Sequence, residues 1–349
     1  MKALKMTGPN KMIIDDVPIP ELESEDEILV EVYYCGICKS DIELLHGTHP
    51  HMVNKNCFYP VIPGHEWSGV VVKAGKDVSE FVIGDRVVGD VSLGCGHCDM
   101  CKTGRFNLCP TRDVIGSFRN RQGAFAQYIR THRRSLYKIP DKLTLKEAAT
   151  IEPAATAAYA TKKSKVKYGD RVLIMGDGSI GLFAIETCKA FGAGEIVLIG
   201  SWPEKLEVAK NIGADYAFSY RTGNAIGEVK TVMKDKMFDV VIDCSGKTSS
   251  INQAIDLVKP GGVVGMVSFY DKPSEVKMND IITKDAEIQG ILASPNMFNG
   301  TLLNMANGLV DAKPLITQEF DFKDIENAFE CMESRDEMSV KIVVNIKGE

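Results

Sequence analysis

Short apolar runs alternate with amphipathic segments through the second half of the chain. The apolar runs are RVLIMG (171–176), EIVLIG (195–200), YAFSY (216–220), FDVVIDCSG (238–246), GGVVGMVSF (261–269) and EIQGILAS (287–294). Between them, helical spacing of apolar residues covers 179–192, 203–213, 225–234 and 250–258. Apolar strands that alternate with helices are typical of a parallel sheet covered on both faces. The pattern therefore predicts a doubly wound α/β domain, which we place at residues 156–294.

The chain before and after this region has a different pattern of apolar and polar residues. Up to about residue 150 it reads as β-rich, with β-branched runs at 28–35 and 69–75 and with glycine and proline as punctuation. After residue 295 the pattern gives a helix, a short strand at 316–320, a helix at 324–334 and an apolar strand at 339–346. This last segment is too short to fold alone. We therefore predict one further domain, made of residues 1–155 and 295–349.

Composition narrows the class of protein. The chain has 349 residues, which is too long for one ordinary core, and its 44% hydrophobic and 25% charged residues are typical of a soluble globular protein. A net charge of −6 and a pI near 5.7 disfavour electrostatic binding to nucleic acid. The N-terminus lacks the apolar core of a signal peptide, and no apolar run reaches the roughly 18 residues that span a bilayer. Ten cysteines in such a chain indicate a reducing cytoplasm, with thiols used as metal ligands.

Four of those cysteines lie close together in a loop at about 94–110. Cys95, Cys98, Cys101 and Cys109 follow the pattern C-x2-C-x2-C-x7-C. A tetrahedral zinc needs four thiolates at about 2.3 Å from one point, and such close spacing lets one loop supply all four. The alternatives are four unrelated thiols or two disulfides. A zinc held by four protein ligands has no open position, so we predict a structural zinc here.

A glycine-rich turn joins the first predicted parallel strand to the next helix. Gly176-Asp177-Gly178-Ser179-Ile180-Gly181 has the form G-x-G-x-x-G, directly after a strand and directly before a helix, which is the context that a dinucleotide-binding loop requires. Gly176 permits the tight turn, Gly178 lets the backbone approach a pyrophosphate, and Gly181 permits close packing of helix on strand. The diphosphate would rest on the helix N-terminus. The alternative is a glycine-rich turn without a ligand.

The residues at the end of the second parallel strand indicate whether the cofactor is NAD or NADP. NAD-binding sites usually place an acidic residue there to bond the 2′-hydroxyl, but this strand ends in Gly200 and Ser201. The missing carboxylate removes repulsion against a 2′-phosphate, to which Ser201 could donate. Lys205, or Arg221 beside Tyr220, could supply positive charge. These features favour NADP over NAD.

Candidate ligands for a second metal are spread along the first half of the chain. The segment CGICKSD supplies Cys38 and Ser40, GHEWSG supplies His65 and Glu66, and TIEPAAT supplies Glu152. Thiol, imidazole and carboxylate are all good zinc ligands, and a catalytic zinc wants three of them and an open position. Each residue also has an ordinary interpretation: a core thiol, a histidine in a turn, or a carboxylate at a helix N-terminus.

Taken together, these motifs resemble those of the zinc-dependent medium-chain alcohol dehydrogenases. C-G-I-C-x-S-D, G-H-E-x-x-G, the four-cysteine lobe, E-P and G-x-G-x-x-G occur in the order of that family, over essentially the whole chain. The resemblance implies a GroES-like catalytic domain into which a Rossmann domain is inserted. It also implies two zinc ions per chain, one catalytic and one structural, and a homodimer or homotetramer.

The resemblance assigns roles by motif. Cys38, His65 and Glu66 are expected to bind the catalytic zinc, with Glu152 beside it, and Ser40 to accept the proton of the substrate hydroxyl. A carboxylate directly after His65 is the pattern of the polyol and threonine dehydrogenase branch. The implied function is hydride transfer between NAD(P) and a secondary alcohol of the polyol, cyclitol or amino-polyol class, which gives the ketone. The alternatives are a threonine- or butanediol-type dehydrogenase, or a zinc- and nucleotide-binding regulatory protein without catalysis. A zinc-ribbon nucleic-acid module is opposed by the acidic pI.

Overall fold

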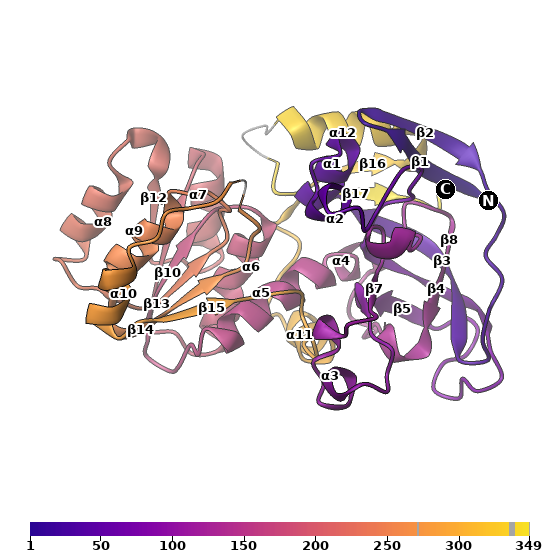
Figure 1. Cartoon of the computed structure of the whole chain (residues 1–349), viewed down its shortest axis with the longest axis horizontal. Coiled ribbons are helices and arrows are strands. Elements are labelled where there is room, and N and C mark those ends of the chain that lie inside the picture. Colours follow the sequence, from indigo (N-terminus) through magenta and orange to yellow (C-terminus); the bar gives the residue numbers. More distant parts are fainter. Residues whose placement is uncertain (271, 335–338, 349) are drawn as a thin grey trace. The chain divides into compact units, whose positions relative to one another are not determined.

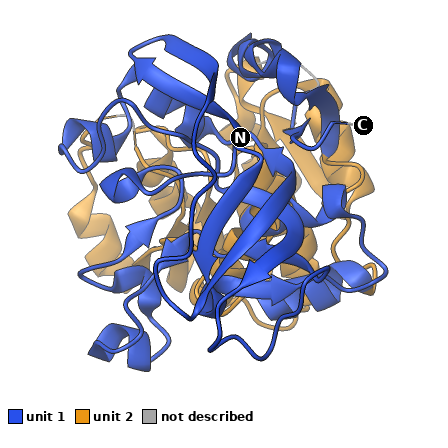
Figure 2. Ribbon diagram, turned by 90° about the vertical axis from the view of Figure 1, so that its right-hand side faces the viewer, with its two compact units in different colours: residues 1–152, 298–306, 316–349 blue, residues 153–297, 307–315 orange. Residues whose placement is uncertain are grey.

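The computed structural model describes residues 1–270, 272–334 and 339–348, which form two compact units. Unit 1 comprises residues 1–152, 298–306 and 316–349, and unit 2 comprises residues 153–297 and 307–315 (Figure 2). The compact units thus change at 152/153 and at 297/298, and residues 307–315 return to unit 2. Our division into domains at 155 and 295 stays a prediction.

Unit 2 is built on a six-stranded parallel sheet (Figure 1). The strand order is β12-β11-β10-β13-β14-β15, and the strands are β10 (Arg171–Met175), β11 (Glu195–Gly200), β12 (Tyr216–Ser219), β13 (Phe238–Asp243), β14 (Val258–Met266) and β15 (Glu287–Gly290). The central residues of the four inner strands, β11, β10, β13 and β14, are buried, which is why their sequences are continuous apolar runs. The predicted parallel sheet is confirmed. Successive strands are added on one side of β10 up to β12 and on its other side from β13 onwards, so the strand order reverses between β10 and β13, which is where doubly wound sheets bind ligands.

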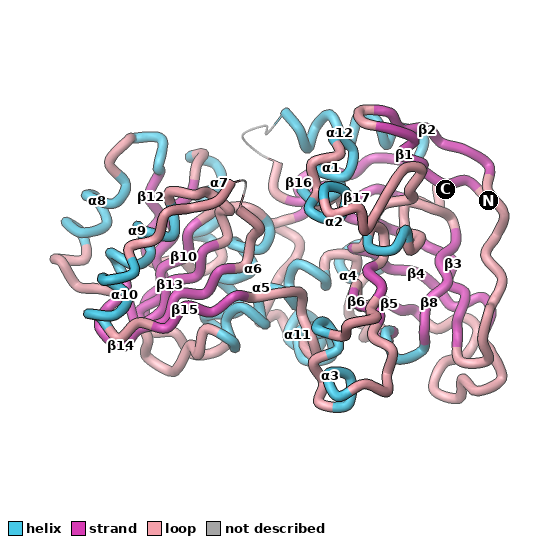
Figure 3. The backbone as a smooth tube through the Cα atoms, viewed as in Figure 1, coloured by secondary structure: helices cyan, strands magenta, loops and turns pink. Residues whose placement is uncertain are grey.

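Helices lie between the strands of unit 2 (Figure 3). The four predicted helices are in the expected order, and a fifth, at Met278–Lys284, was not predicted. They are α6 (Ser179–Ala190), α7 (Pro203–Asn211), α8 (Ala225–Val232), α9 (Ser250–Leu257) and α10 (Met278–Lys284), with a 3-10 turn, η4, at Tyr220–Thr222. Apolar residues of α8 and α9 pack in one core with the sheet strands. Helix α6 is buried from Gly181 to Cys188, which explains why most of its residues are apolar; Glu186 and Thr187 are the buried polar residues of this stretch.

Unit 1 is built on a seven-stranded sheet. Its order is β16-β17-β3-β4-β5-β9, with β8 also paired to β3, and the strands are β3 (Glu27–Gly36), β4 (Glu66–Ala74), β5 (Arg86–Gly89), β8 (Tyr128–His132), β9 (Leu136–Lys138), β16 (Ile316–Asp321) and β17 (Lys341–Asn345). Two small pairs complete it: β1 (Lys2–Gly8) with β2 (Lys11–Asp16), and β6 (Ser92–Leu93) with β7 (Asp113–Val114). Because β17 pairs antiparallel with β3, the late segment returns to the early sheet as expected.

Several helices of unit 1 were not predicted. They are α1 (Lys39–His46), α2 (Pro50–Val53), α3 (Asp99–Lys102) and α4 (Leu145–Ala148); α5 (Ile151–Lys163) begins in unit 1 and continues in unit 2, and the expected late helices are α11 (Phe298–Ala306) and α12 (Ile325–Ser334). Short 3-10 turns lie at Phe106–Leu108, Phe118–Asn120, Arg133–Ser135 and Phe322–Asp324. Helix α1 begins where the Asp41 carboxylate accepts the backbone N–H of its N-cap residue, and it ends at Gly47 in the left-handed region. None of the helices described is long and apolar enough to cross a membrane.

Candidate zinc centres and dinucleotide loop

The four cysteines of the lobe converge on one point. Cys95, Cys98, Cys101 and Cys109 place their Sγ atoms within 4.8 Å of one another. The Sγ atoms of Cys95 and Cys101 are 4.0 Å apart, close to the edge of about 3.8 Å that a tetrahedral site with 2.3 Å bonds requires. The turn of α3 starts directly after Cys98 and carries Cys101 back towards the other thiols.

The surroundings of the lobe favour the thiolate at Cys95 and Cys109, whereas burial raises the pKa of Cys101 to about 12. The backbone N–H of Cys95 donates to the Sγ of Cys109, and that of Cys98 donates to the Sγ of Cys95, each at 3.4 Å. Although burial by itself would raise it, the N–H of Cys95 and the hydroxyl and N–H of Thr111 lower the pKa of Cys109 to about 6. All ten cysteines of the chain are free thiols in the structure. The donor set, its spacing and its hydrogen bonds fit a closed four-thiolate zinc site.

Three of the predicted catalytic ligands also converge. Cys38 is the N-cap of α1, His65 precedes β4, and Glu66 is the first residue of that strand. Their ligand atoms lie within 4.8 Å of one another. Strand pairing brings them together, because Gly36 of β3 is opposite Glu66 of β4. A side chain at Gly36 would fill this space, since its Cβ would lie 2.3 Å from Oε2 of Glu66.

Asp41 supports both Cys38 and His65. Its fully buried carboxylate accepts the backbone N–H groups of Cys38 at 2.9 Å and of Gly64 at 3.2 Å. Oδ1 also lies 3.6 Å from Nδ1 of His65. Burial opposes the charged imidazole, but Asp41 and Cys38 together raise the pKa of His65 well above its usual value. A carboxylate on one ring nitrogen orients the other towards a metal, which is the arrangement common around zinc-binding histidines.

The sequence analysis missed Lys341, which is buried beside the same ligands. Its Nζ lies 2.6 and 2.9 Å from the two carboxylate oxygens of Glu66 and 3.0 Å from the carbonyl oxygen of Ile37. The side chains of Lys341 and Glu66 are each only 1% exposed. Burial opposes the charge of this lysine, but Glu66 raises its pKa above the usual value. A lysine within the apolar run of β17 was the only signal in the sequence.

Glu152 and Ser40 lie on the helices that border this set. Glu152 is buried in the first turn of α5, and its charge acts on both Lys341 and Asp90. It does not belong to the group of three ligand atoms that meet within 4.8 Å among the described residues. Ser40 is a half-buried residue in the first turn of α1, two positions after Cys38.

The glycine-rich loop has the backbone that a dinucleotide site requires. Gly176 has a φ of +109°, in the region open mainly to glycine, and it directly follows β10. A Cβ on Gly181 would lie 1.9 Å from the carbonyl oxygen of Gly176, so only glycine permits this approach. Gly178 is the N-cap of α6, its Cβ position is open, and Ser179 and Ile180 form the first turn. The loop therefore leaves room for a ligand at the N-terminus of the helix.

The predicted ribose contacts are arranged around the end of β11. Gly200 ends that strand, and Ser201 donates to the carboxylate of Asp177. Arg221 stacks on the indole of Trp202, with Cζ 3.2 Å from the ring centroid. Two other predicted residues flank this point: Lys205 in the first turn of α7, and Tyr220 at 56% exposure in η4.

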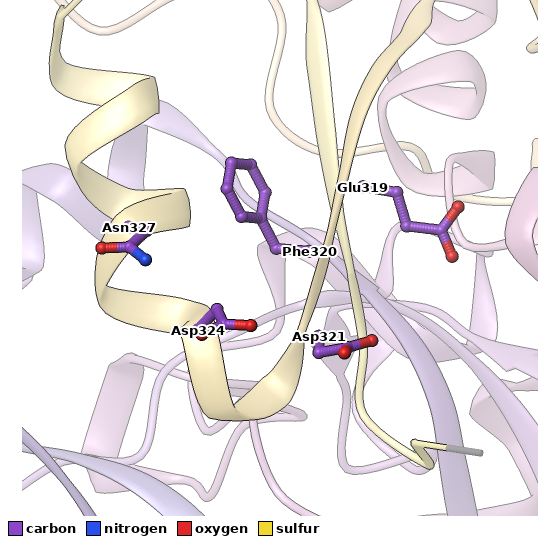
Figure 4. Close-up of a pocket in the computed structure, with 5 residues that line it drawn as sticks. All are labelled: Glu319, Phe320, Asp321, Asp324 and Asn327. Carbon is purple, nitrogen blue, oxygen red and sulfur yellow. The ribbon is translucent and has the colours of Figure 1, made fainter.

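A separate hollow lies between β16 and α12 in unit 1. Figure 4 shows the five residues that line it, which are Glu319, Phe320, Asp321, Asp324 and Asn327. None of them is a predicted ligand, and Lys146 holds the carboxylate of Glu319 at 3.0 Å. We assign no chemistry to this hollow.

Comparison with known proteins places this geometry in a family. Residues 24–141 match the profile described as the alcohol dehydrogenase GroES-like domain, and residues 179–307 match that of the zinc-binding dehydrogenases. The sorbitol dehydrogenase of Bacillus subtilis is 34% identical over 95% of this chain and 93% of its own length. The D-arabitol-phosphate dehydrogenase of Enterococcus avium is 31% identical over 99% and 98%, respectively.

Solved structures agree with these matches. An Escherichia coli oxidoreductase of unknown specificity superposes with a TM-score of 0.93 at 30% identity, covering 99% of this chain and 98% of its own. A zinc-binding dehydrogenase of Sinorhizobium meliloti bound to NADP gives 0.89 at 29% identity, with 99% and 98% covered. An alcohol dehydrogenase of E. coli CFT073 complexed with NADH gives 0.91 at 29%, with 99% of both chains covered.

The chain therefore belongs to the zinc-binding alcohol dehydrogenase family, in its polyol dehydrogenase branch. It is an oxidoreductase with a GroES-like part and a Rossmann part, so the resemblance and the α/β fold class expected from the motifs are confirmed.

Proposed function

We propose that the protein oxidises a secondary alcohol of the polyol, cyclitol or amino-polyol class to the ketone, with NAD(P) as the hydride acceptor. The observation that carries this proposal is the meeting of Cys38, His65 and Glu66 within 4.8 Å in a chain of the zinc dehydrogenase family. The names of its relatives, which include sorbitol and arabitol-phosphate dehydrogenases, support the substrate class.

Two zinc ions per chain fit the donor groups. Cys38, His65 and Glu66, with Glu152 nearby, would hold the catalytic ion, and the four lobe cysteines would hold the structural one. A bound catalytic zinc lowers the pKa of the substrate hydroxyl. A closed set of four thiolates leaves no position for substrate, so the two sites divide structural and chemical roles.

The protein's own residues prepare the site for proton transfer. Asp41 fixes the imidazole of His65 and the backbone at Cys38, so two donors have set positions before substrate arrives. Lys341 balances the buried charge of Glu66. Ser40, in the first turn of α1, is our candidate to accept the substrate proton and to pass it on.

The dinucleotide would lie on the loop at 176–181, with the nicotinamide accepting hydride. The relatives with NADP and with NADH support this cofactor class. We favour NADP, because β11 ends in Gly200 and Ser201 without an acid of its own and because the cationic Arg221 lies close by. We further propose a cytoplasmic homodimer or homotetramer, which size-exclusion chromatography with light scattering would test.

The test is steady-state reduction of NAD and of NADP by zinc-loaded protein across a panel of alcohols. The panel holds sugar alcohols, their phosphates, inositols, amino-cyclitols, threonine and short diols, with zinc content measured on the same sample. Turnover of a polyol or cyclitol is the expected result. Turnover of threonine or a diol alone would favour a threonine- or butanediol-type dehydrogenase. If no alcohol were oxidised and only the lobe zinc were present, a regulatory role without catalysis would be favoured.

Two variants of Ser40 serve as matched controls for the panel. Ser40→Thr keeps a hydroxyl at this position, whereas Ser40→Ala removes it. We expect the alanine variant to lose at least about tenfold in kcat and the threonine variant to keep most of it, with zinc content unchanged in both. Equal activity of the two variants would remove Ser40 from the proton path.

A further inference from the structure

The end of β11 has no acidic residue in its own sequence, but the fold supplies one from the glycine-rich loop. Oδ2 of Asp177 accepts both the backbone N–H and the hydroxyl of Ser201, each at 2.6 Å. Asp177 also packs on Gly200, since a Cβ there would lie 2.9 Å from the same oxygen. Asp177 and Ser201 are 9% and 6% exposed, so this is a buried and fully formed contact.

This contact changes the chemistry of the ribose end. Dinucleotide sites of this fold place a carboxylate at the end of the second strand to accept the ribose 2′-hydroxyl. Here the hydroxyl of Ser201 is committed to Asp177. Within the described part of the chain, no residue donates to the second oxygen, Oδ1, of Asp177. The group left to meet the ribose is thus a carboxylate oxygen, which accepts from a hydroxyl and repels a phosphate.

A cation lies beside the same point. Trp202 directly follows Ser201, and the guanidinium of Arg221 stacks on its indole at 3.2 Å. The hydroxyl of Ser219 donates to the carbonyl oxygen of Ser201 at 2.6 Å, which joins the end of β12 to the end of β11. Among the described residues no carboxylate forms an ion pair with Arg221, whose side chain is exposed. The carboxylate of Asp177 and the guanidinium of Arg221 therefore border the strand end, which Lys205 of α7 also flanks.

We propose that Asp177 and Arg221 together determine cofactor selection, because their opposite charges contact the 2′ substituent of the adenosine ribose. Asp177 accepts the 2′-hydroxyl of NAD and disfavours the 2′-phosphate of NADP, whereas Arg221 pairs with that phosphate. Asp177 therefore restrains the preference for NADP, and the protein binds both dinucleotides. The inference rests on the proposed NAD(P)-dependent function, and it adds a selectivity residue within the loop itself.

The experiment measures binding, so it does not depend on turnover or on zinc. Isothermal titration of the full chain gives the Kd of NAD and NADP, and of the half-ligands 5′-AMP and adenosine 2′,5′-bisphosphate. Asp177→Asn keeps the shape and an acceptor for Ser201 but removes the charge. We expect the ratio of the two Kd values to shift towards NADP by about tenfold, and the half-ligands to shift alike.

Arg221→Gln is the second variant, and we expect it to fold normally because Arg221 is exposed. We expect it to weaken NADP and the bisphosphate by about tenfold and to leave NAD and 5′-AMP within about twofold. The matched control is Glu207→Gln, which removes one exposed carboxylate on the neighbouring helix α7 and should leave the Kd ratio unchanged.

The outcomes separate the inference from the function. An unchanged ratio in Asp177→Asn, or an equal loss for both dinucleotides, would make Asp177 a support for the loop and overturn the inference alone. An equal shift in Glu207→Gln would attribute the effect to net charge and overturn it as well. If the wild-type chain bound neither dinucleotide, the proposed function would fall together with the inference.

Discussion

The two thiol-containing clusters of unit 1 are built in opposite ways. The lobe takes all its donors from residues 95–109, and a single turn, α3, is enough to bring them together. The set around Cys38 and His65 needs a helix N-cap, the pairing of β3 with β4, and a lysine from β17. The first cluster is local in sequence, and the second is assembled by the fold.

The difference in construction accompanies a difference in chemistry. Closing a short loop costs little chain entropy, so four neutral or thiolate sulfurs can meet with backbone N–H groups and the hydroxyl of Thr111 for support. The assembled set instead buries charged side chains, with Asp41 on one side and Lys341 on the other. Buried charges are tolerated only when each has a partner, so the second site depends on long-range contacts that the first does not need.

Removing a donor from the assembled set should have the largest effect on catalysis. We expect Cys38→Ser to reduce kcat to below about one thousandth of the wild-type value, because the metal that activates the substrate hydroxyl is lost. Dinucleotide affinity, measured by titration, should stay within about twofold. A variant that lost dinucleotide binding as well would show that the residues around Cys38 and the dinucleotide loop do not act independently.

Removing a donor from the lobe should act on stability first. We expect Cys98→Ser to bind one zinc fewer and to lower the unfolding temperature by on the order of 10 °C, because a structural zinc contributes to folding outright. At low temperature the folded fraction should keep its kcat. Thermal unfolding and zinc analysis on the same samples test this, and stability equal to wild type would refute a structural zinc in the lobe.

Breaking the long-range ion pair should destabilise unit 1 without touching a thiol. Lys341→Met leaves the buried Glu66 without its partner, and we expect a loss of about 3–5 kcal/mol in the free energy of unfolding. The matched control is Lys347→Met, which removes an exposed ion pair with Glu31 and should cost less than about 1 kcal/mol. Similar losses in the two variants, measured by denaturant unfolding, would show that burial of the pair does not matter.

The same contrast explains what the sequence could predict. The lobe and the glycine-rich loop depend on close spacing, so Cys95–Cys109 and 176–181 were recognisable from the chain alone. The parallel strands were recognisable because a sheet buried on both faces leaves continuous apolar runs. Helix α1 was missed because it is short and its cap uses Asp41 after a cysteine, not one of the usual starting residues.

Long-range contacts left weaker traces. Lys341 stood out only as a charge in an apolar strand, and nothing in the sequence named Glu66 as its partner. The motif G-x-G-x-x-G does not specify the residue at position 177. Only the structure shows that the carboxylate of Asp177 accepts from Ser201. The family motifs identified Cys38 and His65, but only the structure shows that Asp41 lies beside the imidazole of His65.

The ion pair between Glu66 and Lys341 also sets an order of events during biosynthesis. The two residues are 275 positions apart, so at 5–20 residues per second the lysine is made on the order of tens of seconds after the glutamate. Until then Glu66 has no buried counter-charge, and strand β17 is not there to pair with β3. The nascent N-terminal segment can form its cysteine lobe on the ribosome, whereas the core around Cys38, His65 and Glu66 closes only after translation of strand β17.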